Sequence, residues 1–179
     1  MAENTLIKMQ TSEGDIYLKL YDEKAPKSVN NFIGYVNDDF YDGTIFHRVI
    51  STFMIQGGGF TEDLKRKPTR APIKNEADNG LKNDRGTIAM ARLSDPHSAT
   101  AQFFINVQDN NALNFTGKQN TITWGYAVFG EVVQGMDVVD EIRFKETGAK
   151  SPFDKDAPLE NVVIEQVSVV SELPTDGEQ

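Results

Sequence analysis

A single arginine, Arg48, stands within an apolar stretch of the sequence, FHRVISTFMIQGGG, which covers Phe46–Gly59. The stretch contains no acidic residue that could neutralise its charge. A guanidinium stays protonated at any ordinary pH and offers a rigid fork of donors. Arg48 could therefore donate permanently to a reacting group, in surroundings that exclude water and strengthen the interaction. The alternative is an arginine on the solvent face of a strand with its stem on apolar atoms, which is the commoner role.

Strand periodicity suggests a partner for this arginine. In FHRVI a period of two places Phe46, Arg48 and Ile50 on one face, and in FMIQ it places Met54 and Gln56 on one face. If the two segments are neighbours, Gln56 can accept a hydrogen bond from Arg48 and orient the guanidinium. Unlike a carboxylate, an amide oxygen does this without cancelling the charge.

The residues present exclude most other catalytic chemistries. The two histidines, His47 and His97, lie in separate segments without the spacing of metal ligands, and the G-x-S-x-G elbow of serine hydrolases is missing. The glycines Gly57–Gly59 lack the remainder of a phosphate-binding loop and are interpreted as a bend between strands. The sequence has no cysteine, which excludes disulfides, thiolate metal sites and cysteine nucleophiles. We therefore expect neither a metal ion nor a cofactor.

The composition limits the possible partners. The 18 basic and 27 acidic residues give a formal net charge of -9, which repels nucleic acids and anionic membrane surfaces. No stretch approaches the ~20 apolar residues of a membrane span, and nothing favours an oxidising compartment. We expect a cytoplasmic, monomeric protein that binds neither nucleic acid nor membranes, with one domain at 1–170 and a polar tail at 171–179.

The elements that position these side chains are mainly strands. Two amphipathic segments, at 24–40 and 135–142, predict helices. Because strands and helices do not alternate regularly, we expect an antiparallel barrel with a helix over each open end, and not a doubly wound parallel sheet. Two long irregular segments, 61–83 and 108–124, have the length of functional loops. Short β-branched or aromatic runs bounded by Gly, Asn or Asp predict strands at 5–10, 15–21, 44–50, 53–58, 86–92, 101–107, 126–133 and 162–170.

Four motifs along the chain carry a family resemblance. They are FHRVISTFMIQGGGF at Phe46–Phe60, GTIAMAR at Gly86–Arg92, AQFFIN at Ala101–Asn106 and YAVFGEVVQGMDVVDEI at Tyr126–Ile142. In this order they resemble the cyclophilins, which are peptidyl-prolyl cis-trans isomerases, and they look closest to the compact cytoplasmic bacterial members. With the N-terminal hairpin, the resemblance spans nearly the whole chain. It implies a mainly β fold, a closed eight-stranded antiparallel β-barrel capped by two α-helices.

The resemblance also implies roles for individual residues. Arg48 would be the catalytic residue, assisted by Gln56 and Phe53. Arg92 would lie along the peptide backbone beside Ala91. The full set of substrate-binding residues would be Met54, Ala91, Arg92, Gln102, Phe104, Leu113 and Tyr126.

This chain departs from the family's pattern at three positions. Ala112 precedes Leu113 where most members have an aromatic residue, Tyr126 stands where a histidine is common, and Arg92 stands where an asparagine is common. The first departure predicts weak binding of cyclosporin, which packs on that aromatic residue, with Phe115 partly refilling the space.

The expected activity is rotation of X-Pro peptide bonds in proline-containing peptides and in unfolded or folding proteins, without a covalent intermediate. Two other functions stay open. The protein could recruit proline motifs without catalysis, or a barrel could enclose a small apolar ligand, which the many large side chains disfavour. Taken one at a time, Phe53, Met54, Phe104 and Leu113 are also typical of an ordinary core.

Overall fold

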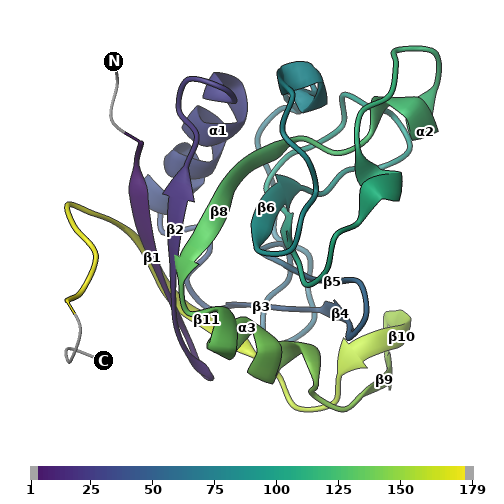
Figure 1. Cartoon of the computed structure of the whole chain (residues 1–179). Coiled ribbons are helices and arrows are strands. Elements are labelled where there is room, and N and C mark those ends of the chain that lie inside the picture. Colours follow the sequence, from purple (N-terminus) through teal and green to yellow (C-terminus); the bar gives the residue numbers. More distant parts are fainter. Residues whose placement is uncertain (1–3, 176–179) are drawn as a thin grey trace.

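The chain folds around a curled antiparallel sheet, seen in the computed structural model in Figure 1. The structure describes residues 4–175, so residues 1–3 of the predicted domain and 176–179 of the predicted tail lie outside the described part. The strands of this part are β1 (Leu6–Thr11), β2 (Gly14–Leu20), β3 (Thr44–Ile45), β4 (Arg48–Ile50), β5 (Met54–Gly57), β6 (Thr87–Met90), β7 (Phe103–Asn106), β8 (Val128–Gln134), β9 (Thr147–Lys150), β10 (Phe153–Pro158) and β11 (Val163–Val170). Its α-helices are α1 (Pro26–Asn37), α2 (Thr121–Trp124) and α3 (Met136–Arg143), with short 3-10 turns at Ala77–Asn79 and Asn111–Leu113.

The main sheet has nine strands in the order β3-β11-β1-β2-β8-β6-β7-β5-β4, while β9 and β10 form a separate hairpin. Its two edge strands, β3 and β4, are consecutive in the sequence and separated only by Phe46 and His47. β3 pairs with β11 and β4 pairs with β5, so the sheet curls into a half-barrel without a ladder between β3 and β4. The expected closed barrel of eight strands is therefore wrong, whereas the mainly β antiparallel architecture is confirmed.

The predicted strand at 44–50 is interrupted, and the interruption changes which residues share a face. Phe46 and Val49 both pack in the main core, whereas Arg48 is exposed and Ile50 packs against a second apolar cluster. The prediction that Phe46 shares a face with Arg48 is wrong, because the interruption shifts the alternation by one residue. The other predicted strands are present, with ends that differ by one or two residues.

Two of the helices lie at opposite ends of the curled sheet (Figure 1) and confirm the two that the sequence predicts. α1 begins at Pro26, whose fixed φ and missing N–H suit the first helical position, and it buries Phe32. α3 buries Ile142 and packs near β2, β4 and β5. The expected total of two helices is wrong, because α2 forms a single helical turn within the irregular segment 108–124.

Two apolar clusters occupy the two faces of the sheet. Successive residues of β7 alternate between them, so Phe103 and Ile105 lie in the main core and Phe104 lies in the second cluster. Aromatic rings fill the inside of the curl: the ring of Phe32 lies 5.7 Å from that of Phe103 and 5.3 Å from that of Phe129, between centroids. This packing disfavours an enclosed small-molecule site.

Among the described residues, no helix has the length and apolar character needed to cross a membrane.

Candidate active site

A row of side chains crosses the outer face of β4, β5 and β7. The register places Arg48 opposite Gln56, and Gln56 opposite Phe104. Directly opposed residues of antiparallel strands have side chains on the same face, close enough to interact. The row therefore sets a permanent cation, an amide and an aromatic ring side by side, which confirms the predicted proximity of Arg48 and Gln56.

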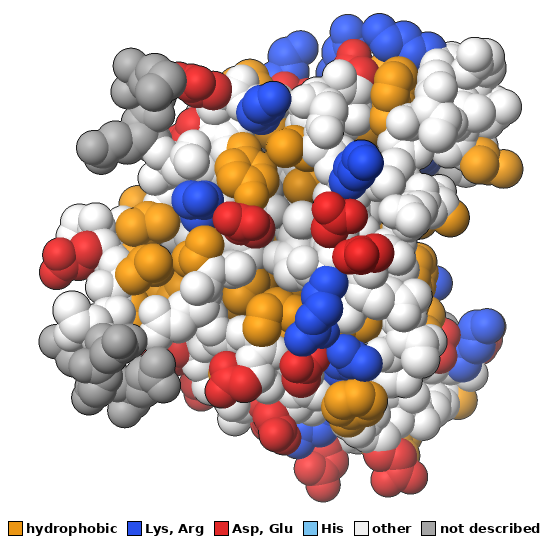
Figure 2. Space-filling model, viewed as in Figure 1, with side chains coloured by type: hydrophobic (Ala, Val, Ile, Leu, Met, Phe, Trp, Pro, Cys, Tyr) orange, Lys and Arg blue, Asp and Glu red, His pale blue; other side chains and the backbone are white. Residues whose placement is uncertain are grey.

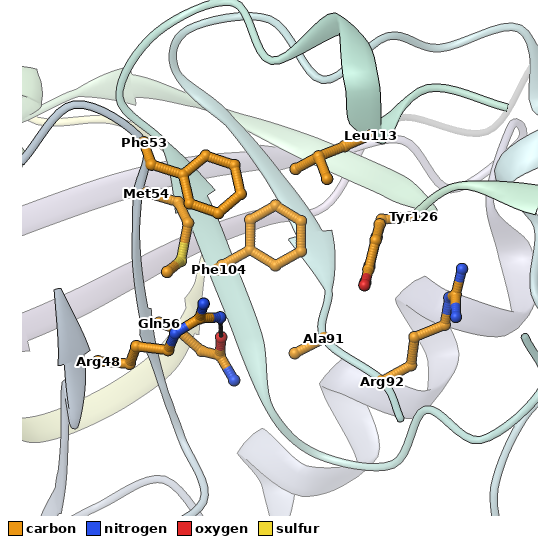
Figure 3. A pocket seen from close by; sticks show the side chains of 9 residues that line it. All are labelled: Arg48, Phe53, Met54, Gln56, Ala91, Arg92, Phe104, Leu113 and Tyr126. Atoms are coloured by element: carbon orange, nitrogen blue, oxygen red, sulfur yellow. Dashed lines mark hydrogen bonds between the residues drawn. The ribbon is translucent and has the colours of Figure 1, made fainter. Parts of the chain in front are cut away.

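This row forms part of a pocket of about 310 Å³, shown in Figure 3. Nine of the ten predicted site residues line it, although they come from strands and loops that are far apart in the sequence. The tenth, Gln102, borders a neighbouring pocket that also includes Gln56, Ala91 and Arg92. The nine are Arg48, Phe53, Met54, Gln56, Ala91, Arg92, Phe104, Leu113 and Tyr126.

Gln56 is held between Arg48 and Gln102. Its amide nitrogen donates to Oε1 of Gln102 over 3.0 Å, which leaves its own Oε1 to accept from Nη1 of Arg48 over 3.4 Å. The second contact is longer than a usual N–H···O bond. The side chain of Gln102 lies against the backbone of Gly59, where an added Cβ would lie 2.5 Å from it. This position of Gln102 therefore depends on a glycine at 59.

The charge of Arg48 is not compensated within the pocket, because none of the lining residues in the described part of the chain is acidic. Acidic side chains gather elsewhere: on the face in Figure 2 they concentrate along its lower edge, near α3 and the β9–β10 hairpin. Phe53, Met54, Phe104 and Leu113 provide apolar surface around the guanidinium. The pocket thus combines an apolar recess with one exposed, permanently charged donor.

His47 precedes Arg48 but is a packing residue in this structure. Its side chain is 5% exposed, and its ring lies 4.6 Å from that of Phe60 and 5.2 Å from that of Phe153, between centroids. Burial, with a smaller contribution from the charge of Arg48, lowers the pKa of His47 to about 4. Its Nδ1 is buried without a hydrogen-bond partner. The imidazole is therefore neutral near pH 7 and stacked under the β9–β10 hairpin.

Three buried asparagines, which the sequence analysis did not single out, hold the pocket walls. Asn106 donates to Oδ1 of Asn83 over 3.0 Å and accepts from Nδ2 of Asn110 over 2.8 Å. The outer two amides then donate to the backbone carbonyls of three lining residues, Phe53, Leu113 and Tyr126. Asparagines near strand ends are also typical of turns, so their pattern in the sequence does not reveal this network.

The positions where the chain departs from the family pattern have different surroundings. Ala112 is exposed, and Phe115 packs against Trp124 with ring centroids 5.5 Å apart. Neither is among the residues that line the pocket, so Phe115 does not refill the space. The guanidinium of Arg92 points away from Arg48, toward the loop that carries Leu113 and Tyr126 (Figure 3).

Comparison with known proteins places this geometry in a family. The family model for cyclophilin type peptidyl-prolyl cis-trans isomerases matches residues 6–169. The chain belongs to this family. It is therefore an isomerase, as the motifs imply.

Bacterial relatives are similar over nearly their whole length. Peptidyl-prolyl cis-trans isomerase B of Escherichia coli is 58% identical over 164 residues, which is 92% of this chain and 99% of that protein. A peptidyl-prolyl cis-trans isomerase of Streptomyces antibioticus is 59% identical over 92% of this chain and 98% of its own length. A cyclophilin of Cryptosporidium parvum, solved in the presence of the dipeptide Ala-Pro, has a TM-score of 0.75 and 25% identity, and the match covers 93% of this chain and 99% of that one.

Proposed function

We propose that this cyclophilin rotates X-Pro peptide bonds by seating the proline ring in the apolar recess and directing the guanidinium of Arg48 at the imide nitrogen. The observation that carries this proposal is the position of Arg48, which lines the recess without an acidic neighbour among the lining residues. Phe53, Met54, Phe104 and Leu113 supply the apolar surface for the ring, and Gln56 orients the donor.

The electronic structure of the peptide bond explains why such a donor accelerates rotation. Conjugation between the nitrogen lone pair and the carbonyl opposes rotation by ~18–20 kcal/mol. Near the perpendicular transition state the lone pair is localised on a pyramidal nitrogen, which then accepts a hydrogen bond that the planar ground state does not accept. A donor aimed at this nitrogen stabilises the transition state selectively, as a rise in kcat requires. No bond is broken and no cofactor takes part.

Orders of magnitude indicate a broadly specific enzyme. Roughly 7 kcal/mol of selective stabilisation, from desolvation, positioning and Arg48 together, corresponds to about 10⁵-fold acceleration. Burying about 100 Å² of a proline ring contributes only about 2.5 kcal/mol, less than the ~4.1 kcal/mol of millimolar affinity. Contacts to the peptide backbone must supply the remainder, which favours many proline-containing peptides and folding proteins over one sequence. The Cryptosporidium cyclophilin was solved in the presence of the dipeptide Ala-Pro, which belongs to the proposed substrate class of proline-containing peptides.

Replacement of Arg48 tests the proposal. Isomerisation of an X-Pro peptide and a proline-limited refolding reaction are measured for the wild type, Arg48→Ala and Arg48→Lys. We expect Arg48→Ala to slow catalysis by about 10²–10³-fold, the effect of removing one transition-state donor. Lysine, which keeps the charge without the planar fork, restores part of the rate. Equal rates for wild type and Arg48→Ala would remove Arg48 from the mechanism.

The competing function, a module that binds proline motifs without catalysis, makes a different prediction. NMR exchange spectroscopy on an X-Pro peptide reports cis-trans exchange while the protein is present. A binding module leaves this exchange as slow as in free peptide, tens to hundreds of seconds, whereas the proposed enzyme accelerates it.

Three further properties are part of the proposal. Weak binding of cyclosporin follows from Ala112, because an exposed methyl group replaces the aromatic surface and Phe115 packs elsewhere. A monomeric state and a cytoplasmic location rest on the composition and on the resemblance to compact cytoplasmic bacterial cyclophilins. Calorimetry with cyclosporin and sedimentation of the purified protein test the first two.

A further inference from the structure

Arg92 has every guanidinium donor directed at the protein. Its Nε donates to the carbonyl of Gly125 over 3.1 Å, and its Nη2 donates to the carbonyls of Gly125 and Thr121 over 2.8 and 2.7 Å. Its Nη1 donates to the carbonyl of Leu93 over 3.0 Å and to Oγ1 of Thr121 over 3.1 Å. A guanidinium has five N–H groups, so this set occupies all of them. No N–H of this side chain is left for a peptide in the pocket.

The same guanidinium packs on a pocket residue. Its Cζ lies 4.4 Å from the centroid of the Tyr126 ring, which in turn meets the ring of Phe104 edge-on at 5.6 Å. Figure 3 shows Arg92 on the far side of Tyr126 from Arg48. A planar cation on an aromatic face is a favourable arrangement, and it fixes the orientation of the ring.

Gly125 connects Arg92 to Leu113 and Tyr126, two residues that line the pocket. Its backbone has φ 68°, and a Cβ at this position would lie 2.6 Å from the carbonyl oxygen of Leu113. Its carbonyl accepts three donors, two from Arg92 and one from Nδ2 of Asn75. The next residue, Tyr126, donates its N–H to the carbonyl of Leu113 over 2.9 Å. Holding Gly125 therefore holds the turn that presents Leu113 and Tyr126.

We propose that Arg92 is a positioning residue that fastens the segment 113–126 over the pocket before substrate arrives. It acts on the peptide through Leu113 and Tyr126, and its side chain makes no hydrogen bond to the peptide. This inference rests on the proposed role of the pocket in binding X-Pro segments. It assigns a structural role to a charged residue at a position where the family resemblance suggests contact with the peptide backbone.

Amide hydrogen exchange in the peptide-free protein separates positioning from direct contact. The N–H of Tyr126 reports the turn, because its bond to Leu113 exists without substrate. In Arg92→Ala we expect exchange at this N–H to be about tenfold faster or more, since several charge-assisted hydrogen bonds are lost. Exchange unchanged within about twofold would overturn the proposal, because local opening would then be independent of Arg92.

Kinetics of the same variants give the second readout. For an X-Pro peptide, we expect Arg92→Ala to raise KM about tenfold while kcat changes much less, because Arg48 and Gln56 stay in place. Arg92→Lys keeps the charge but neither the fork nor the planar face, so we expect it to resemble Arg92→Ala in both readouts. Full recovery by lysine would overturn the proposal in favour of a simple charge effect.

Two other variants complete the design. Thr121→Val removes the hydroxyl that accepts from Arg92 but keeps the Thr121 carbonyl, which also accepts from it, so we expect the same changes in smaller size. This hydroxyl also donates to the carbonyl of Ser94, so in an Arg92→Ala background we expect Thr121→Val to have a smaller effect than in the wild type. Arg70→Ala is the matched control. Arg70 also lies over a tyrosine, 5.0 Å from the ring centroid of Tyr35, and donates to the backbone carbonyl of Gly34. None of these three residues lines the pocket. We expect the kinetics of Arg70→Ala and the amide exchange of Tyr126 in this variant to equal those of the wild type.

The two proposals can fail separately. If the wild type does not accelerate cis-trans isomerisation, the proposed function fails, while amide hydrogen exchange at Tyr126 still decides the role of Arg92.

Discussion

Substitution of Gln56 distinguishes two ways in which this side chain could assist Arg48. Its Oε1 accepts from Nη1 of Arg48 over 3.4 Å, and its amide nitrogen is tied to Gln102. Gln56→Leu removes the acceptor and leaves the charge of Arg48 unchanged. Gln56→Glu has nearly the same shape and keeps an acceptor for Arg48, but adds a negative charge at the same place. The two variants therefore separate orientation of the guanidinium from neutralisation of its charge.

The separation between the two side chains sets the size of the effect. At 3.4 Å two unit charges attract by about 1 kcal/mol in bulk water and about 5 kcal/mol at an effective dielectric constant of 20. The contact is exposed, so we use the lower part of this range, about 1–2 kcal/mol. If the carboxylate weakens the donor's interaction with the imide nitrogen by this amount, kcat/KM falls by roughly 5–30-fold. Loss of orientation alone, in Gln56→Leu, costs about one neutral hydrogen bond, roughly 1 kcal/mol or 5-fold.

The assay is kcat/KM for one X-Pro peptide at pH 7, with the folded state of each variant checked by thermal unfolding. If catalysis needs an uncompensated charge at the imide, kcat/KM should be highest for the wild type and lower for Gln56→Leu, and the value for Gln56→Glu should equal that of Gln56→Leu or lie below it. A role limited to orientation predicts that Gln56→Glu matches or exceeds the wild type, since a carboxylate holds a guanidinium more firmly than an amide does. That second result would refute the electrostatic part of the mechanism.

Four further predictions concern stability, the geometry of the site and the pH dependence of catalysis. The folded pKa of His47 is about 4, below its ordinary 6.5. The neutral imidazole therefore contributes fully to stability above pH 6.5, and about 3 kcal/mol of the free energy of unfolding is lost as the pH falls from 6.5 to about 4. Urea unfolding should show this loss in the wild type, and an equal loss in His47→Phe would contradict the assignment. Asn106→Leu leaves Oδ1 of Asn83 without its donor and Nδ2 of Asn110 with only the carbonyl of Phe53 as acceptor, and should lower the free energy of unfolding by about 2–4 kcal/mol; a neutral effect in urea unfolding would mean that water replaces the amide. Gly59→Ala places a methyl group 2.5 Å from the side chain of Gln102 and should lower kcat/KM several-fold through Gln56; an unchanged rate would show that Gln102 does not support the site. The kcat/KM of the wild type should also be independent of pH between about 6 and 8, because no titrating base takes part; a bell-shaped profile there would contradict the mechanism.

Short-range patterns explain how much of this site could be predicted from the sequence. Alternation within FHRVI and FMIQ predicts that Gln56 can reach Arg48 if the two segments are neighbours, and the β4–β5 register confirms that they are. The assembly of the pocket from distant segments was predicted through the family resemblance, because periodicity does not reveal which loop covers which strand. Leu113, for example, is one apolar residue in an irregular segment, and its place in the wall depends on carbonyl contacts to Asn83.

Features that depend on long-range contacts were missed for the same reason. The β9–β10 hairpin has few buried residues, so its strands lack an apolar alternation, yet it covers His47 through Phe153. Arg92 follows a predicted strand and is named as a peptide contact by resemblance alone. Its five donors are satisfied by backbone and side-chain groups that lie up to 33 residues away in the sequence. No local pattern in GTIAMAR indicates those partners.

The interruption at Phe46 and His47 links the open sheet to the position of Arg48. A continuous strand over 44–50 would place Arg48 on the same face as Phe46, whose side chain is fully buried in the main core. A guanidinium on that face would be desolvated among aromatic rings without a carboxylate, at a cost of several kcal/mol. The one-residue shift in alternation turns Phe46 inward and Arg48 outward, opposite Gln56. The same interruption ends β3 and starts β4 as separate sheet edges. The failure of the sheet to close and the exposure of Arg48 in an apolar recess therefore have one structural cause.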